Sequence, residues 1–342
     1  MKALTFHAHG GPEVLRVEDV PTPEPGPGEV RIDVKAVALN HLDIFVRKGW
    51  PGLKLDMPHW GGCDVAGVVD KVGSGVAAWR PGERVVMYPS LSCGRCRACR
   101  EGQVQRCAQH RLIGEHVRGG AAEKLVLPAE NLCKVPDGFP LDEAAAASLV
   151  FLTAWRMLVT RARVRAGETV LVVGSGGGVN SAAIQIAKLA GARVLAVAGG
   201  PEKVAAAKAL GADEVADYKE VDFSRWAFER TGKEGADVVV DNVGAATWTK
   251  SLKAVARGGR IVTVGGTTGY EPPAGINYVF WKEIEILGST MGTRREFETV
   301  MDLVYRGRLK SVLSHRFPLD QAVEATRVLE AGEAFGKVVI EP

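Results

Sequence analysis

The sequence lacks a long apolar run, a strong excess of charge and an apolar leader. The nearest approach to the roughly 18–20 apolar residues of a membrane span is residues 144–155, which Ser148 and Thr153 interrupt. The 43 basic and 40 acidic residues leave a net charge of only +3, which argues against nucleic acid or an anionic membrane as the main partner. The N-terminus, MKALTFH, has no small-residue cleavage site and no long apolar stretch. We therefore expect a soluble, cytoplasmic protein that acts on a small molecule.

Cysteine is also scarce, and four of the six cysteines fall within fifteen residues: Cys93, Cys96, Cys99 and Cys107. This clustering is typical of a metal site in a reducing compartment rather than of a disulfide framework. Four thiolates can close a tetrahedron around zinc and leave no open position, which predicts one structural zinc per chain.

Two other interpretations of these cysteines remain. An iron–sulfur cluster uses a similar start, C-x2-C-x2-C, but usually has a short final gap and a following proline, whereas Ala108 follows Cys107 here. Two disulfides would need an oxidising compartment, for which the sequence has no signal. Cys133 stands alone and is interpreted as a small buried apolar residue.

The length of 342 residues suits about two domains, and the first, residues 1–150, is β-rich. Residues 30–37 alternate as a half-buried strand does, and residues 65–72 and 83–87 are further short apolar runs separated by turn-forming residues. We expect an irregular β domain that carries a zinc lobe at residues 90–110.

After residue 150 the pattern changes to strand, glycine turn and helix, repeated. Strands are expected at residues 169–174, 193–198, 237–241, 260–265 and 285–288, and helices at 181–190 and 202–210. Buried strands joined by helices predict a doubly wound parallel sheet, an α/β Rossmann domain over residues 151–287. Residues 288–342, with a helix at 294–306 and a strand from 337, are expected to return to the first domain.

The first of these turns has the features of a dinucleotide site. Residues 174–179 read GSGGGV and lie between a buried strand and a helix, so the backbone can approach a pyrophosphate at the helix N-terminus. Asn180 stands where the third glycine of the fingerprint is expected, which raises a question about the local packing of helix on strand. The alternative is a tight turn that binds nothing.

The end of the second strand bears on the choice of cofactor. An NAD enzyme usually has an acid about 20 residues past the loop, which binds the ribose 2′-hydroxyl. Residues 198–203 read AGGPEK, without an acid at the strand end and with Lys203 close by. The sequence therefore favours NADP(H) over NAD(H), although Lys203 can also be read as a solvated helix residue.

Together these features resemble the medium-chain dehydrogenase/reductase family over essentially the whole chain. The proline-rich residues 21–28, then ALNHLD (38–43), GVVDKVG (67–73) and PGERV (81–85), precede the cysteine lobe and the nucleotide loop in the family's order. The resemblance implies a GroES-like β catalytic domain and a Rossmann coenzyme domain. For such a protein we expect a homodimer or a homotetramer.

The family's zinc alcohol dehydrogenases hold a second, catalytic zinc, and this chain departs from their pattern. The three ligand positions correspond to Asn40, Cys63 and about Leu149, and the hydroxyl that relays the alcohol proton corresponds to Leu42. An open zinc site needs about three good protein ligands, so the resemblance implies that the catalytic metal is absent. A replacement site built from Cys63, Asp64 and His59 is the alternative.

The remaining pattern is similar to the quinone oxidoreductase branch, although that branch usually lacks a cysteine lobe. This likeness implies that Lys203 and Tyr218 hold the 2′-phosphate of NADP(H). It further implies a set of cofactor-binding residues in the loop and near the nicotinamide: Thr153, Gly174, Gly177, Gly178, Val179, Asn242, Val264 and Gly265.

The catalytic candidates lie in the first domain. Asn40 can donate to a carbonyl oxygen as hydride arrives. Asp43 is a second candidate, with the alternative that it is a structural partner of a strand end. His41 and His59 are interpreted as surface or packing residues.

Three functions are compatible with these features. The first is an NADPH-dependent reductase of quinones, activated enones or similar carbonyl compounds, without a catalytic metal. The second is a zinc alcohol dehydrogenase with unusual ligands. The third is a non-catalytic nucleotide-binding protein, because a fold does not guarantee a function.

Overall fold

The computed structural model describes all residues from 1 to 342 and divides them into two compact units. Unit 1 comprises Met1–Leu149 and Gly292–Pro342, and unit 2 comprises Val150–Met291. The sequence placed the second boundary at residue 287, four residues early. The chain stays on the sheet of unit 2 beyond that point, because the Ser289 N–H donates to the Thr263 carbonyl at 2.9 Å.

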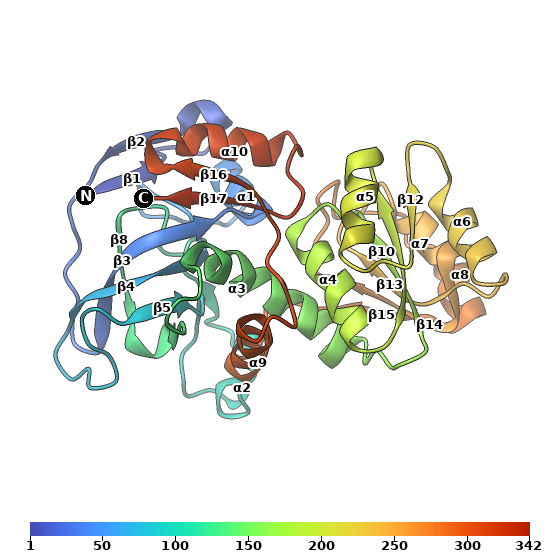
Figure 1. The fold of residues 1–342 in the computed structure, drawn as a ribbon, viewed down its shortest axis with the longest axis horizontal. Helices are drawn as coiled ribbons and strands as arrows, with labels where there is room; N and C mark the ends of the chain where they lie inside the picture. The colour runs from blue at the N-terminus through green and yellow to red at the C-terminus, as the bar shows by residue number, and fades with distance from the viewer. The chain divides into compact units, whose positions relative to one another are not determined.

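Unit 1 is built on a seven-stranded sheet in the order β16-β17-β3-β4-β5-β9, with β8 paired to β3 (Figure 1). Its strands are β3 (Glu29–Ala38), β4 (Asp64–Val72), β5 (Arg84–Met87), β8 (Lys124–Pro128), β9 (Leu132–Lys134), β16 (Leu313–Pro318) and β17 (Lys337–Glu341). Two small sheets pair β1 (Lys2–Thr5) with β2 (Arg16–Asp19), and β6 (Ser90–Leu91) with β7 (Arg111–Leu112). Only β16 and β17 run parallel; the other neighbours are antiparallel.

The chain returns to unit 1 after residue 291, and Val339 and Ile340 of β17 pair with Ala38 and Val37 of β3. The helices of unit 1 are α1 (His41–Lys48), α2 (Arg97–Arg100), α9 (Arg294–Tyr305), α10 (Ala322–Glu330) and the start of α3 (Leu141–Trp155). Short 3-10 turns occupy η1 (Pro12–Val14), η2 (Val104–Arg106), η3 (Ala129–Asn131) and η5 (Leu319–Gln321).

Unit 2 is a six-stranded parallel sheet in the order β12-β11-β10-β13-β14-β15, the doubly wound order with a switch point between β10 and β13. Its strands are β10 (Thr169–Val173), β11 (Arg193–Ala198), β12 (Glu214–Asp217), β13 (Ala236–Asp241), β14 (Val255–Thr263) and β15 (Glu285–Gly288). Around it lie α4 (Gly178–Leu189), α5 (Pro201–Ala209), α6 (Phe223–Arg230), α7 (Trp248–Ala254), α8 (Ile276–Lys282) and the π-helical turn η4 (Arg156–Arg161) (Figure 1). The predicted fold class is thus confirmed.

Several elements differ from the expectation. α4 begins at Gly178, three residues before the predicted start, so the glycine loop leads directly into its first turn. β12 and α6 are among the elements that were not predicted from the sequence. The start of α6 is marked in the sequence by the N-cap residue Asp222, whose carboxylate accepts the Ser224 and Arg225 N–H groups. A hydrogen bond from the Ser224 hydroxyl is the main cause that lowers the pKa of Asp222 to about 2.

One continuous helical segment, Leu141–Arg161, is long and apolar enough to cross a membrane by length and composition. However, 78% of that window is buried inside the structure. The four alanines 144–147 and Leu152 are at most 1% exposed, so the apolar surface of the segment is covered by protein. The segment thus has the burial of a core helix.

Candidate active site and metal centre

The glycine loop of unit 2 has room for a ligand. Gly174 has φ +77°, a value that favours glycine, and a Cβ there would meet Val243 at 2.9 Å. A Cβ on Gly177, the N-cap of α4, would meet nothing within 4 Å. The first N–H groups of a helix have no partner within the helix, so this open backbone can receive a pyrophosphate.

Asn180, which replaces the expected third glycine, joins three segments of the loop region. Its side-chain amide donates to the carbonyls of Val173 at 2.7 Å and Gly174 at 2.9 Å, and its oxygen accepts from Asn242 at 2.7 Å. The Asn242 oxygen in turn accepts the Val264 N–H at 2.9 Å. The helix–strand contact that a glycine would provide is therefore replaced by a hydrogen-bonded link between β10, α4 and β13.

The two residues expected to hold the 2′-phosphate each lie against a glycine of the expected cofactor region. A Cβ on Gly176 would lie 3.2 Å from the Lys203 side chain, and one on Gly199 would lie 2.5 Å from the Tyr218 hydroxyl. Tyr218 is 54% exposed. An acid whose role the sequence did not indicate lies beside Gly200, because Asp217 ends β12 and its carboxylate accepts the Gly200 N–H at 2.9 Å. Its signal was a short strand, residues 214–217, that ends in an acid.

Two buried hydroxyls of unit 2 lack partners. Thr153, expected near the nicotinamide, is 2% exposed, and its Oγ1 has no hydrogen bond. The Oγ of Ser175, inside the glycine loop, is also buried and unpaired. A buried hydroxyl without a partner costs free energy, so both fit a site whose polar ligand completes them.

In unit 1, the residues around the expected catalytic position form a buried ion pair. The Lys337 ammonium donates to Asp64 Oδ2 at 2.7 Å and to the Asn40 side-chain oxygen at 2.6 Å. Asp64 Oδ1 accepts from the Ser148 hydroxyl at 2.5 Å and from the Leu149 N–H at 2.7 Å. Asp64 is 0% and Lys337 3% exposed. We call these residues the Asp64 centre: Asn40, Asp64, Ser148, Leu149 and Lys337.

The hydrogen bonds of Asn40 are at odds with the donor role that the sequence suggested. Its amide donates to Asp64 Oδ2 at 2.9 Å and to the Ala38 carbonyl at 3.4 Å, so both amide hydrogens are directed at protein acceptors. In this arrangement Asn40 positions Asp64 and Lys337 and has no hydrogen left for a substrate oxygen.

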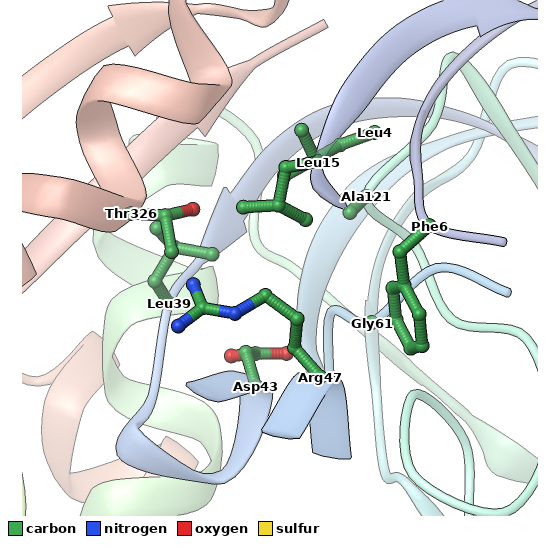
Figure 2. A pocket seen from close by; sticks show the side chains of 9 residues that line it. All are labelled: Leu4, Phe6, Leu15, Leu39, Asp43, Arg47, Gly61, Ala121 and Thr326. Carbon is green, nitrogen blue, oxygen red and sulfur yellow. The ribbon is translucent and has the colours of Figure 1, made fainter. Parts of the chain in front are cut away.

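Asp43 links the start of α1 to the loop before β4. Its carboxylate accepts the Asn40 N–H at 2.8 Å and the Gly62 N–H at 2.8 Å, which corresponds to the structural alternative for this residue. Burial raises the pKa of Asp43. Asp43 and Arg47 line a cavity of about 20 Å³ with apolar neighbours (Figure 2). This space suits one water molecule and is too small for a nicotinamide or a quinone.

His59 and Cys63 are buried beside this region, at 1% and 0% exposure. Burial lowers the pKa of His59 to about 4 and raises the pKa of the Cys63 thiol well above its usual value. The alternative zinc site would combine these two groups with Asp64, whose carboxylate already accepts four hydrogen bonds. Leu149 offers no side-chain ligand. The donor set around Asp64 therefore does not fit a catalytic zinc.

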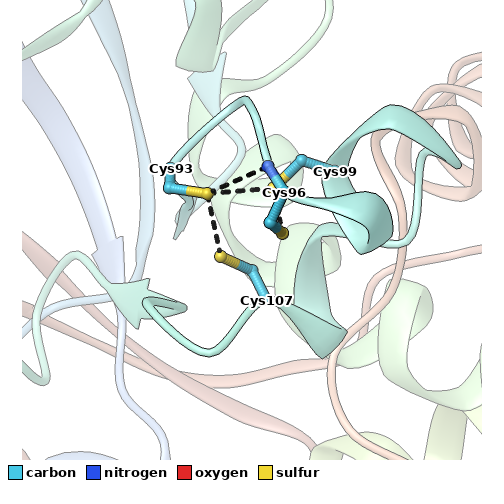
Figure 3. Close-up of side chains that lie close together, drawn as sticks. All are labelled: Cys93, Cys96, Cys99 and Cys107. Atoms are coloured by element: carbon cyan, nitrogen blue, oxygen red, sulfur yellow. Dashed lines mark hydrogen bonds between the residues drawn. The ribbon is translucent and has the colours of Figure 1, made fainter.

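The cysteine lobe has the geometry of a tetrahedral site (Figure 3). The four sulfurs lie within 4.8 Å of one another, with Cys96–Cys99 and Cys93–Cys107 at 3.5 Å and Cys93–Cys99 at 3.9 Å. Four sulfurs at 2.3 Å from a zinc ion would be about 3.8 Å apart. The Cys96 N–H also points at the Cys93 sulfur, at 3.4 Å, as at a thiolate. These residues fit a structural zinc.

Two family models match the chain. The model described as "Zinc-binding dehydrogenase" matches residues 178–306, and the one described as "Alcohol dehydrogenase GroES-like domain" matches residues 26–137.

Similar proteins cover nearly the whole chain. The "Alcohol dehydrogenase" of Schizosaccharomyces pombe is 31% identical and the "Quinone oxidoreductase" of Homo sapiens is 30% identical, each over 99% of this chain and 97% of the other. The "Acryloyl-coenzyme A reductase" of Metallosphaera sedula is 34% identical over 99% of both chains.

Solved structures of alcohol dehydrogenases are also similar to this chain over nearly its whole length. A crystal structure of an "NAD-dependent alcohol dehydrogenase" has a TM-score of 0.96 and 48% identity, with both chains fully covered. The cobalt- and zinc-bound thermostable alcohol dehydrogenase of Pyrobaculum aerophilum has a TM-score of 0.90 and 38% identity, over 100% of this chain and 99% of that chain.

Proposed function

The chain belongs to the medium-chain dehydrogenase/reductase family and is an NAD(P)-dependent oxidoreductase, and we propose that it reduces quinones, activated enones or similar carbonyl compounds with NADPH. The observation that carries this proposal is the Asp64 centre. Where zinc alcohol dehydrogenases of the family are expected to hold a catalytic zinc, this chain has an ion pair between Asp64 and Lys337 at 2.7 Å.

The chemistry of the two reactions differs in what it asks of the protein. Oxidation of an alcohol requires loss of the hydroxyl proton as hydride leaves, and a metal normally assists by stabilising the alkoxide. In the reduction of an activated enone, hydride forms a new C–H bond at the electron-poor β carbon, and the enolate then takes a proton. This step places less charge on a single oxygen, so it suits a site without the zinc ligands. An enoyl thioester belongs to the same substrate class, as the acryloyl-coenzyme A reductase among the relatives illustrates.

The preference for NADP(H) is supported by the position of Lys203 beside Gly176 of the glycine loop and of Tyr218 beside Gly199, just after β11. A cation and a phenol near Gly176 and Gly199 suit a 2′-phosphate. The 48% identical structure described as NAD-dependent favours the other cofactor. We propose that NADPH binds at least about tenfold tighter than NADH, which corresponds to about 1.4 kcal/mol.

One structural zinc per chain, held by the four cysteines of the lobe, is part of the proposal. The fit of the sulfur positions and the name of the matching family model support it. None of the six cysteines forms a disulfide, which suits the reducing cytoplasm, where we place the protein.

We also propose that the chain forms a homodimer or homotetramer. Ile276, Phe280 and Trp281 of α8 are 66–68% exposed, and Ile286 of the edge strand β15 is 43% exposed. Exposed apolar side chains and a strand edge without a partner suit a protein–protein contact. A monomer in light scattering at micromolar concentration would contradict this.

A zinc alcohol dehydrogenase is the second candidate, favoured by the relatives that bear this name. The third, a non-catalytic protein, is set aside because the relatives along the whole chain are enzymes.

The experiment combines metal analysis with an activity panel on the purified protein. We expect about one zinc per chain, and faster NADPH oxidation with a quinone, an enone or an enoyl thioester than NADP⁺ reduction with ethanol or benzyl alcohol. Two zincs per chain, together with alcohol oxidation that Cys63→Ala abolishes, would establish the alcohol dehydrogenase instead.

A further inference from the structure

The strand end that lacks an acid in the sequence receives one from its neighbour. β11 ends at Ala198, and Ala198 is the register partner of Asp217, the last residue of β12. The Asp217 carboxylate reaches across, because Oδ2 accepts the Gly200 N–H at 2.9 Å while Oδ1 accepts the Lys219 N–H at 2.9 Å. A negative charge therefore lies at the carboxyl end of β11, although no residue of β11 carries it.

This carboxylate occupies the entry to α5. Gly200 is the N-cap of α5 and has φ +88°, a value that favours glycine and turns its N–H toward Asp217. Pro201, the first helical residue, has no N–H to offer. The first donor that a phosphate could use at this helix start is thus already bound to an anion.

We infer that Asp217 is a specificity-determining residue that opposes the 2′-phosphate of NADPH, so that the enzyme also uses NADH. The same small region holds both influences: Lys203 and Tyr218 favour the phosphate, and Asp217 repels it. A ribose 2′-hydroxyl carries no charge and is not repelled. The selectivity is therefore a balance between a cation from α5 and an anion from β12, and the inference rests on the proposed binding of the adenosine 2′ position beside Lys203.

The chain contains a matched control for Asp217. Asp213 precedes β12, and its Oδ2 accepts the Val194 N–H of β11 at 2.7 Å, so it joins the same two strands by the same type of hydrogen bond. Asp213 also forms an ion pair with Lys188 at 2.9 Å, so Asp213→Asn removes that contact as well. It lies at the other end of β12, about 13 Å away by strand rise. A structural effect of losing a carboxylate would appear in both Asp213→Asn and Asp217→Asn, whereas a charge effect on the 2′-phosphate belongs to Asp217 alone.

The test measures dissociation constants of NADPH and NADH, and of the fragments adenosine 2′,5′-bisphosphate and 5′-AMP, by calorimetry. For Asp217→Asn we expect NADPH and the bisphosphate to bind about five- to tenfold tighter, from Coulomb repulsion at short range, with NADH and 5′-AMP changed less than about twofold. For Asp213→Asn we expect no change in the ratio. The gain should shrink as salt is raised.

The outcomes separate this inference from the proposed cofactor preference. If Lys203→Ala weakens NADPH but Asp217→Asn leaves all four constants unchanged, the role of Asp217 is wrong and the NADPH preference stands. If the parent binds both cofactors equally and Lys203→Ala changes neither, the preference itself is wrong. Weaker NADH binding by Asp217→Asn would also overturn the inference, because Asp217 would then bind the ribose. Should Asp217→Asn fail to fold, Asp217→Ser keeps an acceptor for Gly200 and removes the charge.

Discussion

The cysteine lobe and the Asp64 centre occupy the two positions at which members of this family are expected to hold zinc. The lobe brings its four sulfurs from residues 93–107, within 4.8 Å of one another. The Asp64 centre brings its groups from the N-cap of α1, β4, α3 and β17, with Asn40 and Lys337 separated by 297 residues. The lobe keeps a full set of metal ligands, whereas the centre has an ammonium group bound to a carboxylate.

The difference shows two ways of stabilising charged side chains that lie close together. Four thiolates repel one another and need a dication to hold them together. Asp64 needs no metal, because Lys337 supplies the opposite charge and four donors satisfy its oxygens. One region should therefore depend on zinc and the other on an ion pair of the chain itself.

The largest loss of stability is expected from a substitution in the cysteine lobe. Cys96→Ser should lose the zinc and lower the free energy of unfolding by roughly 5 kcal/mol or more, because metal binding is coupled to folding of such sites. The measurement is zinc content together with thermal unfolding. Cys133→Ser is the control, since Cys133 lies in β9, outside the lobe. A Cys96→Ser protein that keeps one zinc and the melting temperature of the parent would refute the assignment.

A somewhat smaller effect is expected at the Asp64 centre. Lys337→Met leaves the Asp64 carboxylate buried without its counter-charge, which should cost about 3–5 kcal/mol of unfolding free energy in urea titrations. Lys337→Met with Asp64→Asn should recover part of this loss. Lys2→Met removes an exposed pair with Asp320, which water and salt screen, so it should leave the unfolding free energy nearly unchanged. Equal costs for Lys2→Met and Lys337→Met would mean that the centre contributes no more than a surface pair.

The smallest loss of stability is expected at His59, which unlike Asp64 is buried without an ion-pair partner. Burial depresses its pKa to about 4 from 6.5, so the unfolded chain binds the proton first as pH falls. The stability from neutral His59 is complete above pH 6.5 and decreases below it, by roughly 2 kcal/mol between pH 7.5 and pH 5. His59→Gln should show a correspondingly flatter dependence of unfolding free energy on pH. An identical dependence in parent and variant would show that folding does not lower the pKa of His59.

The elements with local patterns were predictable. β11 and β15 have the predicted bounds, β10 and β13 differ from them by one residue at one end, and β3 is one residue longer at each end. β17 begins at the predicted residue, Lys337. β12 was missed because it has only four residues and half-exposed side chains. Because β12 was not predicted, the acid at the expected cofactor site was not predicted either: it is absent from β11 and is supplied by Asp217 of β12.

The roles of Asn40 and Asn180 also could not be predicted from the sequence. Each was identified as a position of interest from its place in a pattern, but its hydrogen-bond partners lie far away in the chain. Asn40 binds Asp64 and Lys337, and Asn180 binds Asn242. A donor role for Asn40 could be suggested from the residue type, and only its partners show that its amide hydrogens are already used.

The sequence by itself determined the family, the two-domain α/β architecture, the glycine loop and the four-cysteine lobe, because the loop and the lobe depend on residues that are close in the chain. The tertiary structure alone decided that Lys337 neutralises Asp64 and that Asp217 reaches the end of β11. These contacts join residues 273 and 17 positions apart across neighbouring elements. No local period or spacing encodes such a contact, since it depends on strand order and register, which are settled when the sheets form.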